Sequence, residues 1–146
     1  MNRETFRGAI PPHLLYDTDH NMWVRREGDE VVVGATAFGL HLAGEVIAFT
    51  AKPRGAEVER GRSLGTVESA KTVVAVRSPV SLVLDCPNGA AEENPRLVND
   101  DPYGAGWMVR GRPRAWEIEA RRLVDGAAYR AHVLRSEPEA VVEEKP

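Results

Sequence analysis

The stretch GRSLGTVESAKTVVAVRSPVS, residues 61–81, decides the fold and holds the most informative side chain. Residues 63–69 and 72–78 are rich in small and β-branched residues, and Ala70 and Lys71 separate the two runs. This pattern predicts a tight β-hairpin. Lys71 would stand at its exposed tip, where an amine can reach partner molecules without bending the domain. Lys71 is therefore a candidate attachment site, and the simpler alternative is a solvated side chain at a turn.

Lysine is scarce in this chain. Sixteen of the 19 basic residues are arginine, which leaves Lys52, Lys71 and Lys145. An ε-amine can be acylated, whereas a guanidinium stays protonated and is a poor acyl acceptor. Lys52 precedes a proline in a predicted turn and Lys145 lies in the C-terminal tail, so Lys71 is the lysine framed by strands. This position favours the attachment hypothesis.

Length and composition indicate one soluble domain. A chain of 146 residues can bury most of its apolar surface without disulfides or a metal ion. The single cysteine, Cys86, excludes an internal disulfide, and the histidines and Cys86 form no zinc-binding pattern. No apolar run approaches the ~20 residues that span a bilayer, and the first residues lack the pattern of a signal peptide. We expect a cytoplasmic protein that does not bind a membrane.

Negative charge is concentrated at the C-terminus. The formal net charge is -3, and residues 137–146 account for all of it, with four glutamates against Lys145. The rest of the chain is nearly neutral and has no basic stripe, which argues against nucleic-acid binding. We expect a flexible lead-in over residues 1–13, a folded domain over residues 14–135 and a solvated acidic tail over residues 136–146.

Short apolar runs between turn residues predict a mainly β fold. Strands are expected at residues 22–26, 31–33, 46–50, 56–59, 82–84 and 107–110. Turns are expected between them, including residues 52–55 and residues 86–89. Many short strands with turns every 8–12 residues are typical of a sandwich or flattened barrel of antiparallel strands.

Helices are expected at three places. Thr36 and Gly44 predict the two ends of a helix over residues 37–43, with Phe38, His41 and Leu42 on one face. Short helical turns are expected over residues 90–93 and 95–98. After Pro113 the apolar spacing becomes helical, which predicts either one C-terminal helix broken near residues 125–126 or two short helices, packed across the sheet.

The residues give little support for an enzyme. The chain has no nucleophile-elbow motif and no glycine-rich loop between a strand and a helix. The carboxylate pairs at residues 92–93 and 100–101 lie in predicted turns, without an apolar pocket that would separate their pKa values. Two classes remain: a carrier modified on Lys71, and an unmodified small β-barrel binding module. A binding module for single strands would show aromatic residues among basic ones, which the nine aromatic residues here do not.

Three segments carry a resemblance to a known family. Gly65-Thr-Val-Glu-Ser-Ala-Lys71, followed by Arg77-Ser-Pro-Val-Ser81, resembles the lipoyl-lysine hairpin of the glycine cleavage system H protein family. The third segment, Glu93-Asn-Pro-Arg-Leu-Val-Asn-Asp-Asp-Pro-Tyr-Gly-Ala-Gly-Trp107, resembles the signature that follows this hairpin. The similarity covers roughly residues 14–133. Acyltransferase lipoyl domains share the hairpin but not the third segment, and a biotin carrier would have methionine on either side of the lysine.

The resemblance implies a lipoyl carrier domain over residues 14–135, built as a flattened barrel of two antiparallel sheets, with lipoate joined to Lys71 by an amide. The arm would accept an aminomethyl group at glycine decarboxylase, present it to an aminomethyltransferase and be reoxidised by dihydrolipoyl dehydrogenase. The protein itself would not be an enzyme. Glu68 and Gly55, three and sixteen residues before Lys71, match positions that a lipoate-attaching enzyme recognises in the family.

Several residues depart from the family pattern. Leu82 stands where the family usually has glycine, and one extra residue separates Tyr16 from Trp23, so that His20 is only a loose counterpart of the family's histidine. The turn at residues 52–55 is basic where H proteins are often acidic. These features resemble the H-like lipoate-binding proteins associated with sulfur oxidation, whose arm carries sulfur intermediates for a heterodisulfide-reductase-like complex. Both pathways stay open from the sequence.

Overall fold

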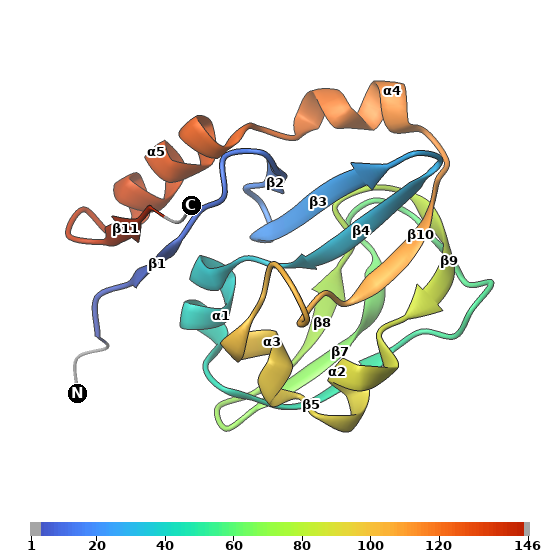
Figure 1. Cartoon of the computed structure of the whole chain (residues 1–146), viewed down its shortest axis with the longest axis horizontal. Coiled ribbons are helices and arrows are strands. Elements are labelled where there is room, and N and C mark those ends of the chain that lie inside the picture. Colours follow the sequence, from blue (N-terminus) through green and yellow to red (C-terminus); the bar gives the residue numbers. More distant parts are fainter. Residues whose placement is uncertain (1–3, 145–146) are drawn as a thin grey trace.

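The computed structural model describes residues 4–144, in which two antiparallel sheets dominate (Figure 1). A six-stranded sheet has the order β2-β3-β4-β10-β9-β6, a three-stranded sheet has the order β5-β7-β8, and a parallel ladder joins β1 to β11. The strands are β1 (Arg7–Ala9), β2 (Leu15–Asp17), β3 (Met22–Glu27), β4 (Glu30–Ala35), β5 (Val46–Ala51), β6 (Glu57–Val58), β7 (Ser63–Ser69), β8 (Val73–Arg77), β9 (Leu82–Pro87), β10 (Val109–Pro113) and β11 (Val141–Glu143). The helices are α1 (Ala37–Ala43), α2 (Gly89–Glu93), α3 (Arg96–Asp100), α4 (Trp116–Glu119), the short 3₁₀ helix η1 (Ala120–Arg122) and α5 (Gly126–Ser136).

The main core lies between the two larger sheets. Leu64 and Val67 of β7 and Val76 of β8 lie in one buried cluster with Val31 and Val33 of β4. The prediction of a mainly β fold with two antiparallel sheets is confirmed. The strand orders show two open sheets within residues 4–144, so the arrangement is a sandwich and the barrel is not closed.

Helix α1 begins and ends where its capping residues predict. The hydroxyl of Thr36 accepts a hydrogen bond from the Gly39 amide at 3.0 Å, and Gly44 follows the helix with φ 94°. The predicted face is wrong in one position, because Leu40 is buried while Leu42 is 37% exposed. The helix packs Phe38 against the N-terminal segment, which rotates Leu42 toward solvent.

The C-terminal region forms the predicted broken helix. Helices α4 and η1 precede an extended residue, Leu123, and α5 then begins at its cap Asp125, whose carboxylate accepts from the Ala128 amide at 2.9 Å. Tyr129 and Val133 of α5 are fully buried in a second apolar cluster, outside the main core. The cluster also contains Phe6, Ile10, Leu14, Tyr16, Trp23, Val32 and Phe38.

The two ends of the chain differ from the predicted flexible lead-in and solvated tail. β1 and β11 pair in parallel, with Gly8 opposite Val142, and Phe6 is 3% exposed. The Glu137 carboxylate accepts from the Phe6 amide at 3.0 Å. Sparse apolar residues gave no local signal, because their burial depends on partners far along the chain, in α1 and in α5. Residues 1–3 of the predicted lead-in and residues 145–146 of the predicted tail, Lys145 among them, lie outside the described residues.

Two boundaries near the chain's middle also differ from prediction. Cys86 is one of the last residues of strand β9 and pairs with Arg110, whereas the sequence predicted that it lies in a turn. Strand β10 begins at Val109, later than the residues 107–110 that were predicted. Between them α2 and α3 form in sequence, as the two predicted helical turns. In the part of the chain that the structure describes, no helix is long and apolar enough to cross a membrane.

Candidate functional site

The β7–β8 hairpin forms as predicted and presents Lys71 to solvent. Glu68 pairs with Val73, and the Ser69 amide donates to the Thr72 carbonyl at 2.8 Å, which closes a turn over residues 70–72. Lys71 is exposed in this turn. Figure 1 shows the turn projecting beyond the body of the sheet, beside the segment that joins α1 to β5. The amine of Lys71 is thus on a short, hydrogen-bonded support.

Ser69 holds the backbone of the tip and was not singled out from the sequence. It is 5% exposed, and its hydroxyl accepts from the Lys71 amide at 3.2 Å and from the Thr72 amide at 3.3 Å. The same hydroxyl lies 3.4 Å from the Thr72 carbonyl, to which it donates. Serine hydroxyls commonly bond to the backbone two or three residues on, and this preference was the available signal.

The third resembling segment, distant in sequence, contributes to the support of the tip. Asn99 of α3 accepts from the Val46 amide at 2.8 Å through its side-chain oxygen, and its side-chain nitrogen lies 3.4 Å from the Gly44 carbonyl. Gly44 is in turn a close neighbour of the lysine, since a Cβ built on it would lie 3.8 Å from Cδ and Cε of Lys71. The stem of Lys71 therefore lies over a stretch of backbone that Asn99 fixes.

A hollow of about 500 Å³ opens beside Gly44, between α1, α3 and the N-terminal segment. Its lining includes the basic residues Arg7 and His41 and the acidic residues Glu45 and Asp100. His41 is tied to the C-terminal region, because its Nε2 lies 3.2 Å from the Glu137 carboxylate.

The other two predicted site residues, Glu68 and Gly55, lie far apart from each other. Glu68 is exposed, two positions before the turn, between Ala48 of β5 and Val73 of β8. Gly55 lies in the turn after β5. The Lys52 amide, three residues before it, donates to the Leu64 carbonyl near the start of β7. Gly55 is therefore roughly 20 Å along the strands from the hairpin tip. It has φ 90°, a backbone conformation that favours glycine, and its amide donates to the Leu84 carbonyl at 2.7 Å. The structure thus brings Glu68, but not Gly55, next to Lys71.

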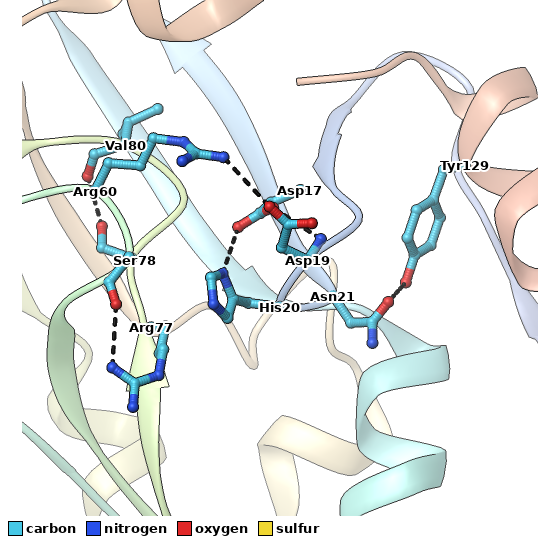
Figure 2. Close-up of polar contacts among 10 residues, drawn as sticks. Asp17, Asp19, His20, Asn21, Arg60, Arg77, Ser78, Val80 and Tyr129 are labelled. Atoms are coloured by element: carbon cyan, nitrogen blue, oxygen red, sulfur yellow. Dashed lines mark hydrogen bonds and ion pairs between the residues drawn. The ribbon is translucent and has the colours of Figure 1, made fainter. Parts of the chain in front are cut away.

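A second polar group lies around the β2–β3 turn and has a structural role (Figure 2). The buried carboxylate of Asp17 lies 3.0 Å from Nδ1 of His20 and accepts from the Asp19 amide at 3.0 Å. Asp19 itself lies 3.7 Å from the guanidinium of Arg60. Among residues 4–144 no group of three or more histidine, cysteine or acidic side chains could hold a metal ion. These contacts tie the turn to the neighbouring strands.

The remaining candidates serve as backbone supports or are solvated. Glu92 accepts from the Ala51 amide at 3.0 Å, and Asp101 accepts from the Ala105 amide at 2.8 Å. Cys86 is a free, exposed thiol whose sulfur donates to the Pro87 carbonyl at 3.4 Å. The chemistry therefore concentrates on an exposed lysine at the end of a rigid hairpin.

Comparison with known proteins identifies the family. The family model described as glycine cleavage H-protein matches residues 14–136. The chain belongs to the glycine cleavage H-protein family. A glycine cleavage system H protein of Mycolicibacterium vanbaalenii is 41% identical over 127 residues, which is 85% of this chain and 96% of the relative. One of Bacteroides thetaiotaomicron is 37% identical over 124 residues, with 85% and 97% coverage.

A solved structure agrees with this assignment. The crystal structure of a glycine cleavage system H protein from Mycobacterium marinum superposes with a TM-score of 0.74 at 32% identity. The match covers 84% of this chain and 97% of that chain. Strand β1 lies before the residues that the family model matches, and β11 lies after them. The parallel ladder is therefore built from segments outside the matched H-protein region.

Two of the three departures from the H-protein pattern, the extra residue before Trp23 and Leu82, lie in the six-stranded sheet or its turns and not in the hairpin. Tyr16 still pairs with Trp23, and the extra residue between them is taken up in a turn where Asn21 adopts φ 57°. Leu82 is fully buried at the start of β9, between Val58 and Pro113. It is a core residue of the six-stranded sheet.

Proposed function

We propose that this chain is a lipoyl carrier of the glycine cleavage system, with lipoate joined by an amide to Nζ of Lys71. The observation that carries the proposal is the placement of Lys71, exposed at a turn whose backbone Ser69 fixes. A fixed backbone with a free side chain suits a tethered group, because it anchors the arm while leaving it mobile. Tethering raises the effective concentration of the carried group at each partner enzyme.

The residues around Lys71 fit an attached acyl chain. Gly44 does not crowd the side chain of Lys71. Even a Cβ atom added at Gly44 would lie at an ordinary van der Waals distance from Cδ and Cε of the lysine. When bound, lipoate would supply a dithiolane whose sulfur can carry an aminomethyl group. The chain's own residues position the arm, and the chemistry belongs to partners: glycine decarboxylase, an aminomethyltransferase and dihydrolipoyl dehydrogenase. The protein itself is then a cytoplasmic carrier and not an enzyme.

The test is intact-mass analysis of protein incubated with lipoate and an active lipoate-attaching enzyme. We expect one lipoyl increment on the wild-type chain, its complete loss in Lys71→Arg, and its persistence in Lys52→Arg. The two variants change the same kind of side chain, one at the tip and one at the turn after β5. An unmodified wild-type protein would contradict the proposal and favour an unmodified binding module.

The alternative cargo is a sulfur intermediate, passed to a heterodisulfide-reductase-like complex. The basic turn at residues 52–55 favours it, although Arg54 there already lies 3.5 Å from Asp85. Loading of the lipoylated protein by glycine decarboxylase separates the two pathways. We expect loading at a rate comparable to that of a functional H protein. Failure to load, with that control active, would assign the arm to the sulfur pathway.

A further inference from the structure

We propose that Ile47, Ala48, Glu68 and Val73, here called the tip platform, form the docking surface for the enzyme that acylates Lys71. The inference rests on the proposed function and adds a partner surface to it. Glu68 matches a known recognition position of the family, whereas the apolar side chains around it carry the new assignment. The partner's matching surface would be apolar with a basic side chain at its centre.

The two large apolar side chains of the tip platform are exposed. Val73 is 63% exposed and Ile47 is 53% exposed, although large apolar side chains on a small domain are usually covered. Val74, on the other face of the same strand, is 41% exposed. Exposed apolar side chains that gather in one place mark interaction surfaces, whereas scattered ones need no explanation.

Strand register brings these side chains onto one face of the three-stranded sheet. Glu68 lies opposite Ala48 on one side and opposite Val73 on the other. The β5–β7 register shifts between Val46 and Ala48, so that Ile47 lies in an irregularity beside this row. Side chains directly opposite in antiparallel strands lie about 5 Å apart. Glu68 therefore stands between apolar neighbours on both sides.

The next row of the face is neutral as well. Thr66 lies between Thr50 of β5 and Ala75 of β8, and all three are exposed. Glu68 is the charged residue in these two rows of paired residues. Within residues 4–144 it forms no ion pair. A single carboxylate within an apolar surface favours a partner that supplies an arginine or lysine at that point, since arginine is enriched at protein interfaces and its guanidinium matches a carboxylate.

One edge of the same sheet is covered and the other is open. The free edge of β5 is capped by side chains of α2 and α3, which accept hydrogen bonds from the Ala51 and Val46 amides. Strand β8 is the opposite edge, and within residues 4–144 it pairs with β7 alone. The open edge and the tip platform are continuous at Val73, so a partner can approach from this side without displacing a helix.

Proximity to the reacting atom selects the attaching enzyme as the occupant. In the acylation, Nζ of Lys71 gives up its protons to solvent or a base and attacks the carbonyl carbon of an activated lipoyl group. A C–N bond forms, and the bond to the activating phosphate or thiol leaving group breaks. This enzyme must bring its active site to Nζ itself, which lies on a stem over Gly44. Enzymes that act at the far end of the arm have no such requirement.

The test measures the rate of lipoyl attachment to the whole chain by intact-mass analysis. We expect Val73→Asp and Ile47→Asp each to lower kcat/KM of the attaching enzyme about tenfold, mainly through KM, as expected for lost contacts in an interface core. Matched controls are Val141→Asp and Ile118→Asp, which place the same change at exposed valine and isoleucine side chains in β11 and α4. The controls should keep the wild-type rate. Thermal unfolding of all four variants checks that they are folded.

The outcomes separate this inference from the proposed function. Wild-type acylation with equal rates in Val73→Asp and Val141→Asp would overturn the tip platform and leave the carrier function intact. Normal acylation of Val73→Asp with lost loading by glycine decarboxylase would assign the surface to that enzyme, and would equally overturn the inference. Absence of acylation in the wild-type protein would overturn both.

Discussion

The hairpin sheet and the terminal cluster hold their side chains in opposite ways. In the hairpin sheet, β5, β7 and β8, the tip is kept in place by a few local hydrogen bonds from Ser69, and its side chains are exposed. In the terminal cluster, β1, β11 and α5, segments more than 100 residues apart interlock around buried aromatic rings. The comparison separates two tasks, presentation of an amine and stabilisation of the domain.

Helix α1 lies between these two regions (Figure 1). Phe6 packs edge-on against Phe38 with ring centroids 5.3 Å apart, while Gly44 at the other end of the helix lies beside the stem of Lys71. Helix α1 therefore connects the terminal cluster to the site. If the two tasks are independent, damage to the cluster should lower stability and leave acylation of the folded protein unchanged.

The largest expected effect comes from Tyr129→Ala. Tyr129 is fully buried, stacks on Tyr16 with centroids 4.5 Å apart, and its hydroxyl lies 2.7 Å from the Thr36 hydroxyl and 2.8 Å from the Asn21 side-chain oxygen. Removing the ring should lower the free energy of unfolding by about 3–5 kcal/mol. Urea denaturation measures this loss.

Tyr129→Phe is the matched variant, because it keeps the ring and removes the hydroxyl. It should cost about 1–3 kcal/mol by leaving its buried partners unsatisfied. At a temperature where both variants are folded, Lys71 should be acylated at the wild-type rate. A slower acylation in the folded variants would break the separation between the two regions.

Alkaline pH should destabilise the terminal cluster next most strongly. Burial raises the pKa of Tyr103 to about 12, and burial also raises the pKa values of Tyr16 and Tyr129. The unfolded chain's tyrosines lose their protons near pH 10, so above that pH the unfolded state binds fewer protons than the folded state. The free energy of unfolding therefore keeps its full value below pH 10. It falls as pH rises toward 12, by on the order of 1 kcal/mol per pH unit for each such tyrosine.

Unfolding free energies between pH 8 and pH 11.5 measure this slope. Tyr103→Phe should flatten it, although the variant is less stable at pH 8, since the hydroxyl donates to the Ala9 carbonyl at 2.8 Å and accepts from the Ala37 amide at 3.0 Å. An unchanged slope in Tyr103→Phe would show that the alkaline loss arises elsewhere in the molecule.

The difference between local contacts in the hairpin sheet and long-range contacts in the terminal cluster also explains which parts of the structure the sequence could predict. The hairpin follows from residues adjacent in the chain, since β-branched runs and a two-residue break give a local signal. Helix α1 follows from Thr36 and Gly44 for the same reason, because capping depends on neighbouring backbone groups. Lys71 was found through this local signal, whereas its support by Asn99 depends on a contact across the fold.

The terminal cluster could not be predicted in this way. Phe6 and Ile10 are isolated apolar residues in a polar segment, and what buries them is α1 and α5. The acidic composition of residues 137–146 indicates a solvated tail, but Glu137 accepts a backbone hydrogen bond from Phe6 across the fold. Leu40 and Leu42 of α1 differ in burial for a similar reason, since the choice between them depends on the packing partner.

Glu137→Ala should have an intermediate effect and tests how much this one side chain holds the ends together. It removes the acceptor for the Phe6 amide and the contact with Nε2 of His41. Loss of an acceptor for a part-buried amide should cost about 1–3 kcal/mol. Hydrogen exchange of the amides in β1 should become faster, while the amides of β7 and β8 keep their protection.

Glu139→Ala is the matched control, since Glu139 is an exposed glutamate two residues further along the same segment. It should change stability by less than about 0.5 kcal/mol, as surface substitutions usually do. If both variants lower stability equally, the effect comes from the charge of the segment and not from the contacts of Glu137.

The smallest expected effect on stability is that of Ser69→Ala, and it lies on the hairpin side of the comparison. The variant removes the hydroxyl that accepts from the Lys71 and Thr72 amides, so it should cost about 0.5–1.5 kcal/mol. Hydrogen exchange at these two amides should become faster, because the turn loses its internal support. Ser63→Ala is the control at the other end of β7, where the hydroxyl bonds to the backbone of Gly65. It should leave the exchange at the tip unchanged. If hydrogen exchange of the Lys71 and Thr72 amides stays slow in Ser69→Ala, the pairing of strands β7 and β8 is enough to fix the backbone of Lys71, and the Ser69 hydroxyl is not required.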